Sequence, residues 1–262
     1  MLKIGWIDFL NTLPFNFERA GIKPSFQYKL VKDVPSILNT KLRKGEIDLG
    51  IVSSAEYIEN FKNYLIIPDF SISAINKVYS VAIFSNRELT KIEKIFLTKK
   101  SKSSRYLTKI IFEIFLKKKV LYLDLQDINR VKKDAILLIG DEAILSLNKF
   151  KYVYDLSEIW YKNEHLPFVF ALWVVRKDSF LKKEKEIREF IDVLSISQRE
   201  IFDNLDKYLE NNKIEKQFLK FYLKNLDYSL NEKHINSLRT FSCYLHQLDI
   251  IKEEPEFDII TF

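Results

Sequence analysis

The sequence has few of the residues on which many specialised sites depend. Of its 262 residues, one is cysteine, three are histidine and five are glycine. A lone cysteine excludes an internal disulfide and a cysteine-based metal cluster, so we expect Cys243 to be a small buried apolar residue. The histidines stand far apart and form no H-x-H or HExxH pattern, which argues against a zinc site. The sequence therefore predicts no bound metal ion.

Long apolar segments are also missing. The longest, residues 168–175, is much shorter than the roughly 20 residues that a membrane-spanning helix needs. No export signal is apparent near the N-terminus, where Asp8 and Asn11 interrupt the apolar stretch. We therefore expect a cytoplasmic protein that does not enter a membrane.

Charge of one sign is not concentrated anywhere in the chain. The net charge of +6 comes from 42 basic and 36 acidic residues that are interleaved, and the longest basic run is 117–119. No nucleic-acid-binding motif accompanies that run. The composition thus predicts a solvated surface rather than a nucleic-acid interface, with a mild positive field that can attract an anionic small molecule.

Nucleotide and hydrolase motifs are absent as well. The chain has no phosphate-binding glycine-rich loop, no dinucleotide fingerprint, no nucleophile elbow and no paired-carboxylate motif. Any chemistry would therefore depend on hydroxyl groups, amides and backbone dipoles. Such a site suits a substrate that brings its own charges.

What the sequence does contain is a regular alternation of strand and helix patterns. One series of short apolar strands and amphipathic helices covers residues 1–61, and a second covers residues 94–154. Two longer apolar stretches, Ile72–Ser85 and Pro167–Arg176, connect the series, and from Asp178 onward the pattern is helical. The prediction is an α/β, two-lobed, periplasmic-binding-protein-like (type II) fold with mostly parallel sheets, two crossing strands and a helical C-terminal region.

The crossings divide the predicted fold into two lobes. Residues 1–80 and 175–262 should form lobe one, and residues 81–174 lobe two. In open α/β sheets, ligands bind beyond the carboxyl ends of the strands. We therefore expect a substrate cleft between the lobes.

Polar side chains follow several predicted strands, at the points where helices should begin. A helix N-terminus carries unpaired N–H groups and a partial positive charge, so such residues can either cap the helix or help to bind a carboxylate. Taken singly, each is most simply interpreted as a cap, and for Asp141 a cap is the favoured interpretation. Taken together, they favour ligand binding more strongly, because the predicted fold directs these junctions from both lobes at one cleft. The candidates are Asn11, Thr12, Ser53, Ser54, Ser101, Ser103, Ser104 and Asp141, and also Ser80, which lies midway along the first crossing strand.

Six segments, in order along nearly the whole chain, resemble the chorismate dehydratases of the futalosine route to menaquinone. The strand–LNTLP–helix opening and the LPFVFALW stretch, which contains Phe168, are the most specific parts. One departure is Asn76–Tyr79, where the family commonly has Gly-Pro before the crossing strand. The segments are GWIDFLNTLPF (5–15), KGEIDLGIVSSAEY (44–57), PDFSIS (68–73), AILLIGDEAI (135–144), YDLSEIWYKNEHLPFVFALWVVRKD (154–178) and YLKNLDYSLNEKHINSL (222–238).

The resemblance implies a cofactor-free lyase. It would remove water from chorismate to give 3-[(1-carboxyvinyl)oxy]benzoate (3-enolpyruvylbenzoate), the first step of that route. A proton leaves the ring carbon that bears the enolpyruvyl ether, and the neighbouring hydroxyl is expelled. The resemblance assigns catalysis to Asn11, which would orient the reacting groups while the substrate's own enolpyruvyl carboxylate acts as the base. The serines Ser53, Ser54, Ser80, Ser101, Ser103 and Ser104 would contact substrate carboxylates, and Thr12, Asp141 and Phe168 are weaker candidates.

Two other functions remain open at this point. The sibling 1,4-dihydroxy-6-naphthoate synthase shares the fold and uses a mid-chain histidine as base, for which His165 is the only candidate here. We interpret His165 as a loop or core residue. A non-catalytic solute-binding module for a small carboxylate is the other alternative, because secreted binding proteins share this fold.

Overall fold

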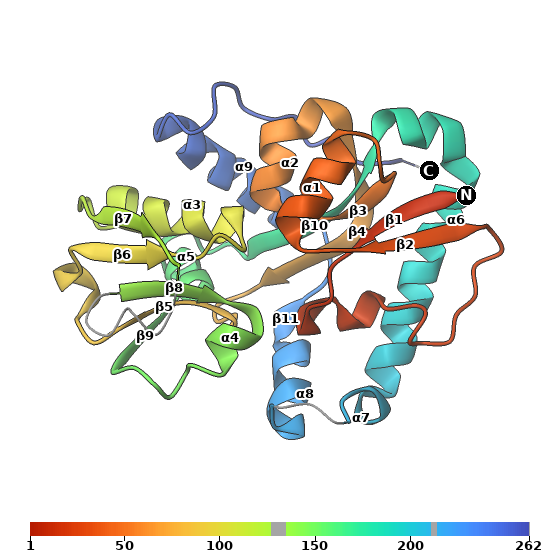
Figure 1. Ribbon diagram of the computed structural model, residues 1–262. Helices are drawn as coiled ribbons and strands as arrows, with labels where there is room; N and C mark the ends of the chain where they lie inside the picture. The colour runs from red at the N-terminus through yellow and green to blue at the C-terminus, as the bar shows by residue number, and fades with distance from the viewer. Residues whose placement is uncertain (127–134, 211–213, 262) are drawn as a thin grey trace.

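The computed structural model describes residues 1–126, 135–210 and 214–261, which form two β-sheets with helices around each (Figure 1). Among these residues the first sheet has six strands in the order β11-β4-β10-β3-β1-β2. Its strands are β1 (Leu2–Trp6), β2 (Tyr28–Lys32), β3 (Leu49–Ser53), β4 (Tyr64–Ala74), β10 (Phe168–Arg176) and β11 (Leu226–Asp227).

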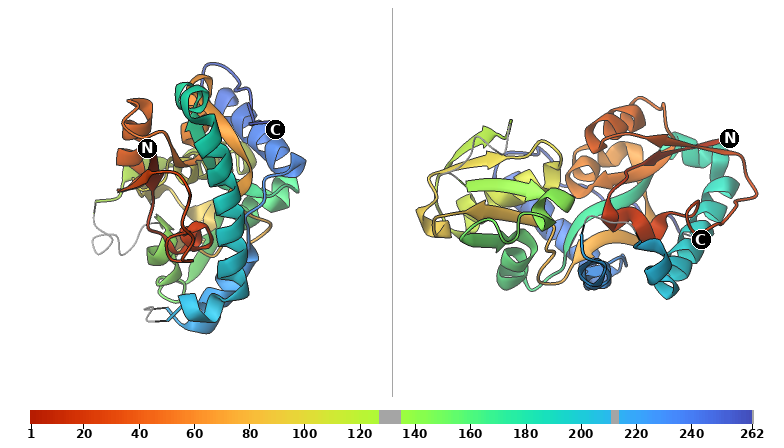
Figure 2. Two further views of the ribbon diagram at one scale, coloured as in Figure 1. Left: turned by 90° about the vertical axis from the view of Figure 1, so that its right-hand side faces the viewer. Right: turned by 60° about the horizontal axis from the view of Figure 1, so that its bottom comes forward.

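The second sheet has five strands in the described residues, in the order β7-β6-β8-β5-β9. The two sheets lie side by side and form separate lobes, as Figure 2 shows most clearly in its right-hand view. The predicted two-lobed α/β architecture is thus confirmed. The strands are β5 (Val81–Ser85), β6 (Lys94–Leu97), β7 (Leu121–Asp124), β8 (Ala135–Ile139) and β9 (Tyr152–Asp155).

Helices follow the strands in both lobes, and the C-terminal helices pack mainly on the first sheet. The helix α9 contacts β10 in the first sheet and also α3 beside the second, so it joins the two lobes. The α-helices are α1 (Pro35–Arg43), α2 (Ser54–Asn60), α3 (Lys102–Ile110), α4 (Gly140–Ile144), α5 (Leu156–Glu164), α6 (Lys177–Asp203), α7 (Leu205–Tyr208), α8 (Lys216–Asn225) and α9 (Glu232–Gln247). Short 3₁₀ turns are η1 (Leu10–Phe15), η2 (Phe61–Asn63) and η3 (Leu89–Lys91), and the π-helical turn η4 (Ile111–Phe115) extends α3.

Both sheets are mixed, whereas the sequence predicted mostly parallel ones. In the first sheet β1 pairs in parallel with β2 and β3, but β10 pairs antiparallel with both β3 and β4. In the second sheet β5 pairs antiparallel with β8 and β9. The reason is that β5 and β10, the strands next to the connections between the lobes, run antiparallel to the strands of the βα units beside them. In the first sheet, β10 lies between β3 and β4.

The connections between the lobes also differ from the predicted crossing strands. The stretch Ile72–Ser85 is not one strand, because β4 ends at Ala74 and β5 begins only at Val81. Asn76 and Tyr79 lie between them with left-handed φ values of 69° and 62°, so the chain leaves the extended conformation there. The second predicted stretch forms β10, which pairs with β3 and β4 in the first sheet. The chain therefore passes from the second lobe back to the first through α5, which lies between β9 and β10. The lobe boundaries after residues 80 and 174 remain predictions.

The N-terminal junction turns earlier than predicted. The strand–LNTLP–helix opening places a helix after LNTLP, but this segment itself forms the 3₁₀ helix η1. The Thr12 hydroxyl lies 2.8 Å from the carbonyl oxygen of Ile7 and 2.7 Å from that of Phe9, so it bonds to the backbone between strand and helix. This side-chain bond favours a tight turn immediately after the strand.

The C-terminal region is helical as predicted, with the exception of β11 and the tail from residue 249; residues 211–213 lie outside the described residues. The expectation that Cys243 is buried is wrong, because its side chain is exposed. The buried residues of α9 include Ile235, Leu238, Phe241 and Leu245, which recur three or four positions apart and so form one face. At position 243 the helix has turned away from that face.

A single buried carboxylate joins the two connections between the lobes. Asp155, which is 5% exposed, caps α5 by accepting hydrogen bonds from the backbone N–H groups of Ser157 and Glu158 at 3.1 and 3.2 Å. It also accepts bonds from the N–H groups of Val78 and Tyr79, at 3.0 and 2.7 Å. Burial raises the pKa of Asp155 to about 6, while the four N–H groups stabilise its ionised form. At neutral pH it therefore acts as an acceptor for both connections.

We expect Asp155→Asn to lower the free energy of unfolding by about 2–4 kcal/mol, since its amide nitrogen cannot accept and leaves buried N–H groups without partners. The matched control is Asn231→Ala, which removes the side chain that caps α9 and should cost about 0.5–2 kcal/mol. Urea unfolding of both variants measures the difference. An Asp155→Asn variant no less stable than the control would show that Asp155 acts only as a helix cap.

Candidate functional site

A cavity of about 210 Å³ is lined by residues from both lobes. A single water needs only about 10–15 Å³ measured in the same way, so the cavity can hold a small organic molecule. Its walls come from the ends of strands and the starts of the helices that follow them. The lining residues are Ile7, Phe9, Asn11, Thr12, Pro35, Ser36, Asn39, Arg43, Ile51, Val52, Ser53, Glu56, Ile72, Val78, Ser80, Val81, Lys99, Lys100, Ser101, Lys102, Ser104, Ile139, Gly140, Phe170 and Ala171.

Asn11 lines this cavity and carries a side-chain oxygen without a partner among the described residues. Its Oδ1 atom is buried and has no hydrogen-bond partner among the described residues. A buried amide oxygen without a partner costs about 1–3 kcal/mol, so a ligand that donates a hydrogen bond there would recover that energy. The neighbouring Thr12 also lines the cavity, but its hydroxyl is already bonded to the backbone. Thr12 therefore holds the junction, and Asn11 is left to contact a ligand.

Four of the predicted serines line the cavity. The Ser53 hydroxyl caps α2, where it accepts from the Glu56 N–H at 3.3 Å. The Ser101 hydroxyl caps α3, accepting from the Ser104 N–H at 3.2 Å, and the two serine hydroxyls are 2.9 Å apart. The fourth, Ser80, lies at the end of the first connection. Capping and lining the cavity are thus compatible roles, since a capping hydroxyl keeps a hydrogen to donate.

Four predicted site residues do not line the cavity, and three of them, Ser54, Ser103 and Phe168, lie in the protein interior. The Ser54 hydroxyl donates to the backbone carbonyl of Val169, and the Ser103 hydroxyl accepts from the Ala55 N–H at 2.9 Å. Both serines are fully buried. Phe168 packs in the core, with its ring centroid 5.2 Å from that of Trp160. These side chains support the walls of the cavity from behind.

Asp141 lies in a different place. It lines a separate cavity of about 160 Å³ together with Asp8, Arg19 and Tyr208. Partial burial raises the pKa of its carboxyl group. Its interpretation as a helix cap is wrong, because the N-cap position of α4 is Ile139 and Asp141 belongs to the first turn.

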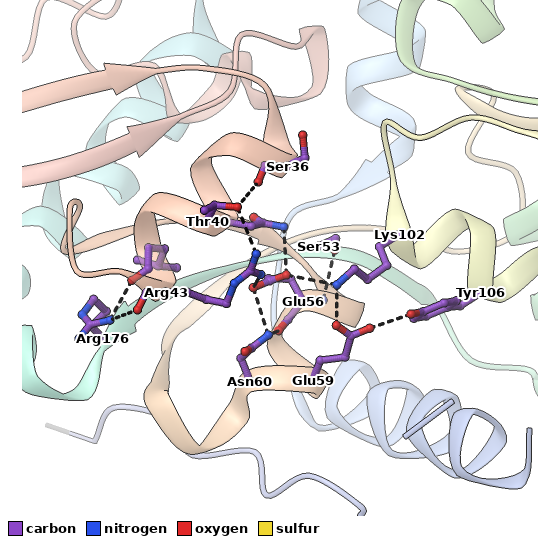
Figure 3. A network of polar contacts seen from close by, with 12 residues as sticks. Ser36, Thr40, Arg43, Ser53, Glu56, Glu59, Asn60, Lys102, Tyr106 and Arg176 are labelled. Carbon is purple, nitrogen blue, oxygen red and sulfur yellow. Dashed lines mark hydrogen bonds and ion pairs between the residues drawn. The ribbon is translucent and has the colours of Figure 1, made fainter. Parts of the chain in front are cut away.

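Sequence analysis missed a buried carboxylate at the wall of the main cavity (Figure 3). Glu56 on α2 is fully buried and forms an ion pair with Arg43 of α1. It also accepts a bond from Asn39 at 3.3 Å, and its Oε2 lies 3.5 Å from Nζ of Lys102 on α3. Lys102 pairs in turn with Glu59. One carboxylate therefore connects two helices of the first lobe with a helix of the second.

The sequence did contain a signal at Glu56, but it points to another role. Ser53-x-x-Glu56 matches the capping-box pattern, in which the glutamate side chain bonds back to the N-cap backbone. Only the serine half is formed, and the glutamate side chain turns to Arg43 instead. Arg43 belongs to another element, so the local pattern could not reveal the ion pair.

The lining residues give the cavity a positive balance. Four are basic, and Glu56 is the only carboxylate among the described lining residues. Lys99 and Lys100 pair with acids at the rim, Asp124 at 3.1 Å and Glu142 at 2.9 Å. The cavity thus suits an anionic ligand, and its described lining includes no histidine, cysteine or tyrosine.

Comparison with known proteins identifies the family. The profile of a family described as "Menaquinone biosynthesis" matches residues 2–247. The chain belongs to this family. A curated relative, the chorismate dehydratase of Thermus thermophilus, is 28% identical over an alignment that covers 82% of this chain and 86% of the relative.

Solved structures show how widely the fold of this menaquinone biosynthesis family member is shared. A protein from Archaeoglobus fulgidus matches with a TM-score of 0.76 at 16% identity, covering 95% of this chain and 98% of its own. The ligand-binding component of an ABC-type import system from Staphylococcus aureus matches with a TM-score of 0.72 at 12% identity, covering 99% and 96%. The periplasmic aliphatic sulphonate binding protein from Escherichia coli gives 0.68 at 12%, covering 98% and 95%. These matches confirm the periplasmic-binding-protein-like fold.

The described residues offer neither a metal cluster nor a membrane-spanning helix. Within the described ranges, no group of three or more His, Cys, Asp and Glu side chains could hold a metal ion. In the same part of the chain, no helix combines the length and apolar character needed to cross a bilayer.

We expect Glu56→Gln to lower the free energy of unfolding by about 1–2 kcal/mol. The amide keeps the shape of the side chain but removes the charge that pairs with Arg43 and Lys102, whose side chains are about one-third exposed and can be hydrated instead. The matched control is Glu59→Gln on the same helix, which should cost about 0–1 kcal/mol because Glu59 is less buried. Equal losses of stability in the two variants would contradict the assignment of Glu56 as the central anion.

Proposed function

We propose that this protein dehydrates chorismate to 3-enolpyruvylbenzoate in the cavity between its lobes. The observation that carries the proposal is Asn11, which lines a positively balanced cavity together with serines and whose buried Oδ1 has no partner among the described residues. The Thermus thermophilus relative supports it, because that protein is a chorismate dehydratase. The LNTLP segment, which carried the resemblance in the sequence, also forms the wall that contains Asn11.

Binding of the substrate would rest on hydroxyl groups and on the positive field. Chorismate carries two carboxylates, and the hydroxyls of Ser53 and Ser80 would donate to them, as would one of Ser101 and Ser104, because the bond between these two serines uses one of their hydrogens. The apolar side chains of Ile7 and Phe170 offer contact surface for the ring. When the ring carbon loses its proton, negative charge spreads towards the ring carboxylate, and hydrogen bonds held on that carboxylate stabilise it.

The choice of base follows from what lines the cavity. The single carboxylate among the described lining residues, Glu56, is held by Arg43 and Lys102 and is poorly placed to accept a proton. We therefore assign proton removal to the enolpyruvyl carboxylate of the substrate, which is near the ring carbon that bears the ether. The C–H bond breaks towards that carboxylate, the neighbouring C–O bond breaks, and the hydroxyl leaves as water with the proton. Asn11 would orient these groups.

The position of His165 favours this reaction over that of the sibling naphthoate synthase. His165 ends α5 in the left-handed conformation, with a φ of 58°, and its side chain is exposed. It is not among the residues that line the cavity. A base at that position would not reach a ligand bound between the lobes.

Incubation of the purified protein with chorismate tests the proposed function. We expect chorismate to be replaced by a single product that is lighter by one water and shows aromatic ring protons by NMR. A heat-treated sample controls for spontaneous decay of chorismate. If chorismate instead raises the melting temperature and is not consumed, the protein is a binding module and the proposal is wrong.

Variants of Asn11 test its role. We expect Asn11→Ala to lower kcat about a hundredfold, because misplacement of reacting groups by about 1 Å has effects of that size. The stability of Asn11→Ala should change little, because the side-chain oxygen that it removes makes no hydrogen bond within the described residues. The matched control is Asn16→Ala, which removes a side chain that accepts from the Arg19 N–H at 3.0 Å outside the cavity. Asn11 has no catalytic role if both variants turn over chorismate at the wild-type rate.

A further inference from the structure

Ser80, the cavity serine at the end of the connection between β4 and β5, forms a hydrogen bond to a residue outside the cavity lining. The hydroxyl of Tyr222, on α8, donates a hydrogen bond of 2.9 Å to Oγ of Ser80. Tyr222 is 1% exposed and Ser80 is 2% exposed, so this bond is shielded from water. Ser80 lines the cavity, whereas Tyr222 does not.

The same helix holds the backbone of the connection that leads to Ser80. Asn225 donates from Nδ2 to the carbonyl oxygen of Lys77 at 2.6 Å. The ring of Tyr79 packs edge-on against Phe221, with centroids 5.2 Å apart. Contacts from α8 therefore flank the hydroxyl bond and fix its geometry.

The backbone of Ser80 is also tied to the end of the neighbouring strand β8. Its carbonyl oxygen accepts from the N–H of Gly140 at 2.7 Å, and Gly140 begins α4. With the backbone fixed, the remaining freedom of Ser80 is the rotation of its side chain and the direction in which its hydroxyl hydrogen points.

The bond from Tyr222 limits that freedom. A serine hydroxyl has one hydrogen to donate and two lone pairs to accept with. Tyr222 occupies one lone pair, and no acceptor for the Ser80 hydrogen exists among the residues that the structure describes. The hydrogen is therefore left to point at a ligand in the cavity.

We propose that Tyr222 is a positioning residue that aims the Ser80 hydroxyl at an oxygen of the bound substrate. The proposal rests on the proposed function, since it takes the ligand to be chorismate. Tyr222 acts only through Ser80 and does not touch the substrate. Without the phenol hydroxyl, the Ser80 hydroxyl can rotate away from the substrate or remain without a partner.

The test compares Tyr222→Phe with Tyr228→Phe. Both changes remove one buried phenol hydroxyl, but that of Tyr228 has no hydrogen-bond partner among the described residues. We expect Tyr222→Phe to lower kcat/KM for chorismate roughly tenfold, the effect of losing one hydrogen bond. Tyr228→Phe should remain within about twofold of wild type. Equal kcat/KM values in the two variants would overturn the proposal, because a merely structural hydroxyl would produce that result.

A double variant separates positioning from a general loosening of the site. If Tyr222 acts through Ser80, then Tyr222→Phe should change kcat/KM less than twofold when Ser80 is already alanine. A full tenfold loss in the Ser80→Ala background would overturn the proposal. Wild-type turnover is measured in the same series. A wild type that does not consume chorismate contradicts the proposed function, whereas an active wild type with an equally active Tyr222→Phe variant contradicts only this inference.

Discussion

The arrangement of the site depends on how the two lobes are joined, and the joint depends on one buried carboxylate. Asp155 caps the helix of the return connection and at the same time holds the N–H groups of Val78 and Tyr79 in the outgoing one. Ser80, the next residue along, lines the cavity. The cavity has walls from both lobes, so its shape exists only while these connections keep their positions. A buried acceptor with four donors resists movement because any shift leaves a polar group unpaired.

A second constraint fixes the charges around the cavity. Glu56 holds Arg43 from one lobe and Lys102 from the other at the cavity wall. Because Arg43 and Lys102 are already paired, they contribute a positive electrostatic field and help to orient a ligand. They do not supply a free acid or base. This arrangement suits a reaction in which the substrate supplies the base and gains aromaticity. The protein then needs to bind carboxylates, exclude water and keep Asn11 in place.

The sequence predicted those features that depend on neighbouring residues. Strand and helix alternation, the helical C-terminal region and the strand that precedes Asn11 are examples. It failed where partners are distant along the chain. The antiparallel insertion of β10, the left-handed turn at Tyr79 and the ion pair of Glu56 all depend on such contacts. The same limit applies to Ser54 and Ser103, whose position after a strand resembles that of their cavity-lining neighbours, although their hydroxyls bond within the protein.

A crystal structure with bound 3-enolpyruvylbenzoate tests the central claim most directly. The account predicts that the product lies in the cavity between the sheets, with a carboxylate about 3 Å from the Ser80 hydroxyl and at least one of Ser101 and Ser104. Asn11 should contact the product at the ether or at the ring carbon that carries it. A product bound elsewhere, or in this cavity but turned so that Asn11 contacts only the far edge of the ring, would contradict the account.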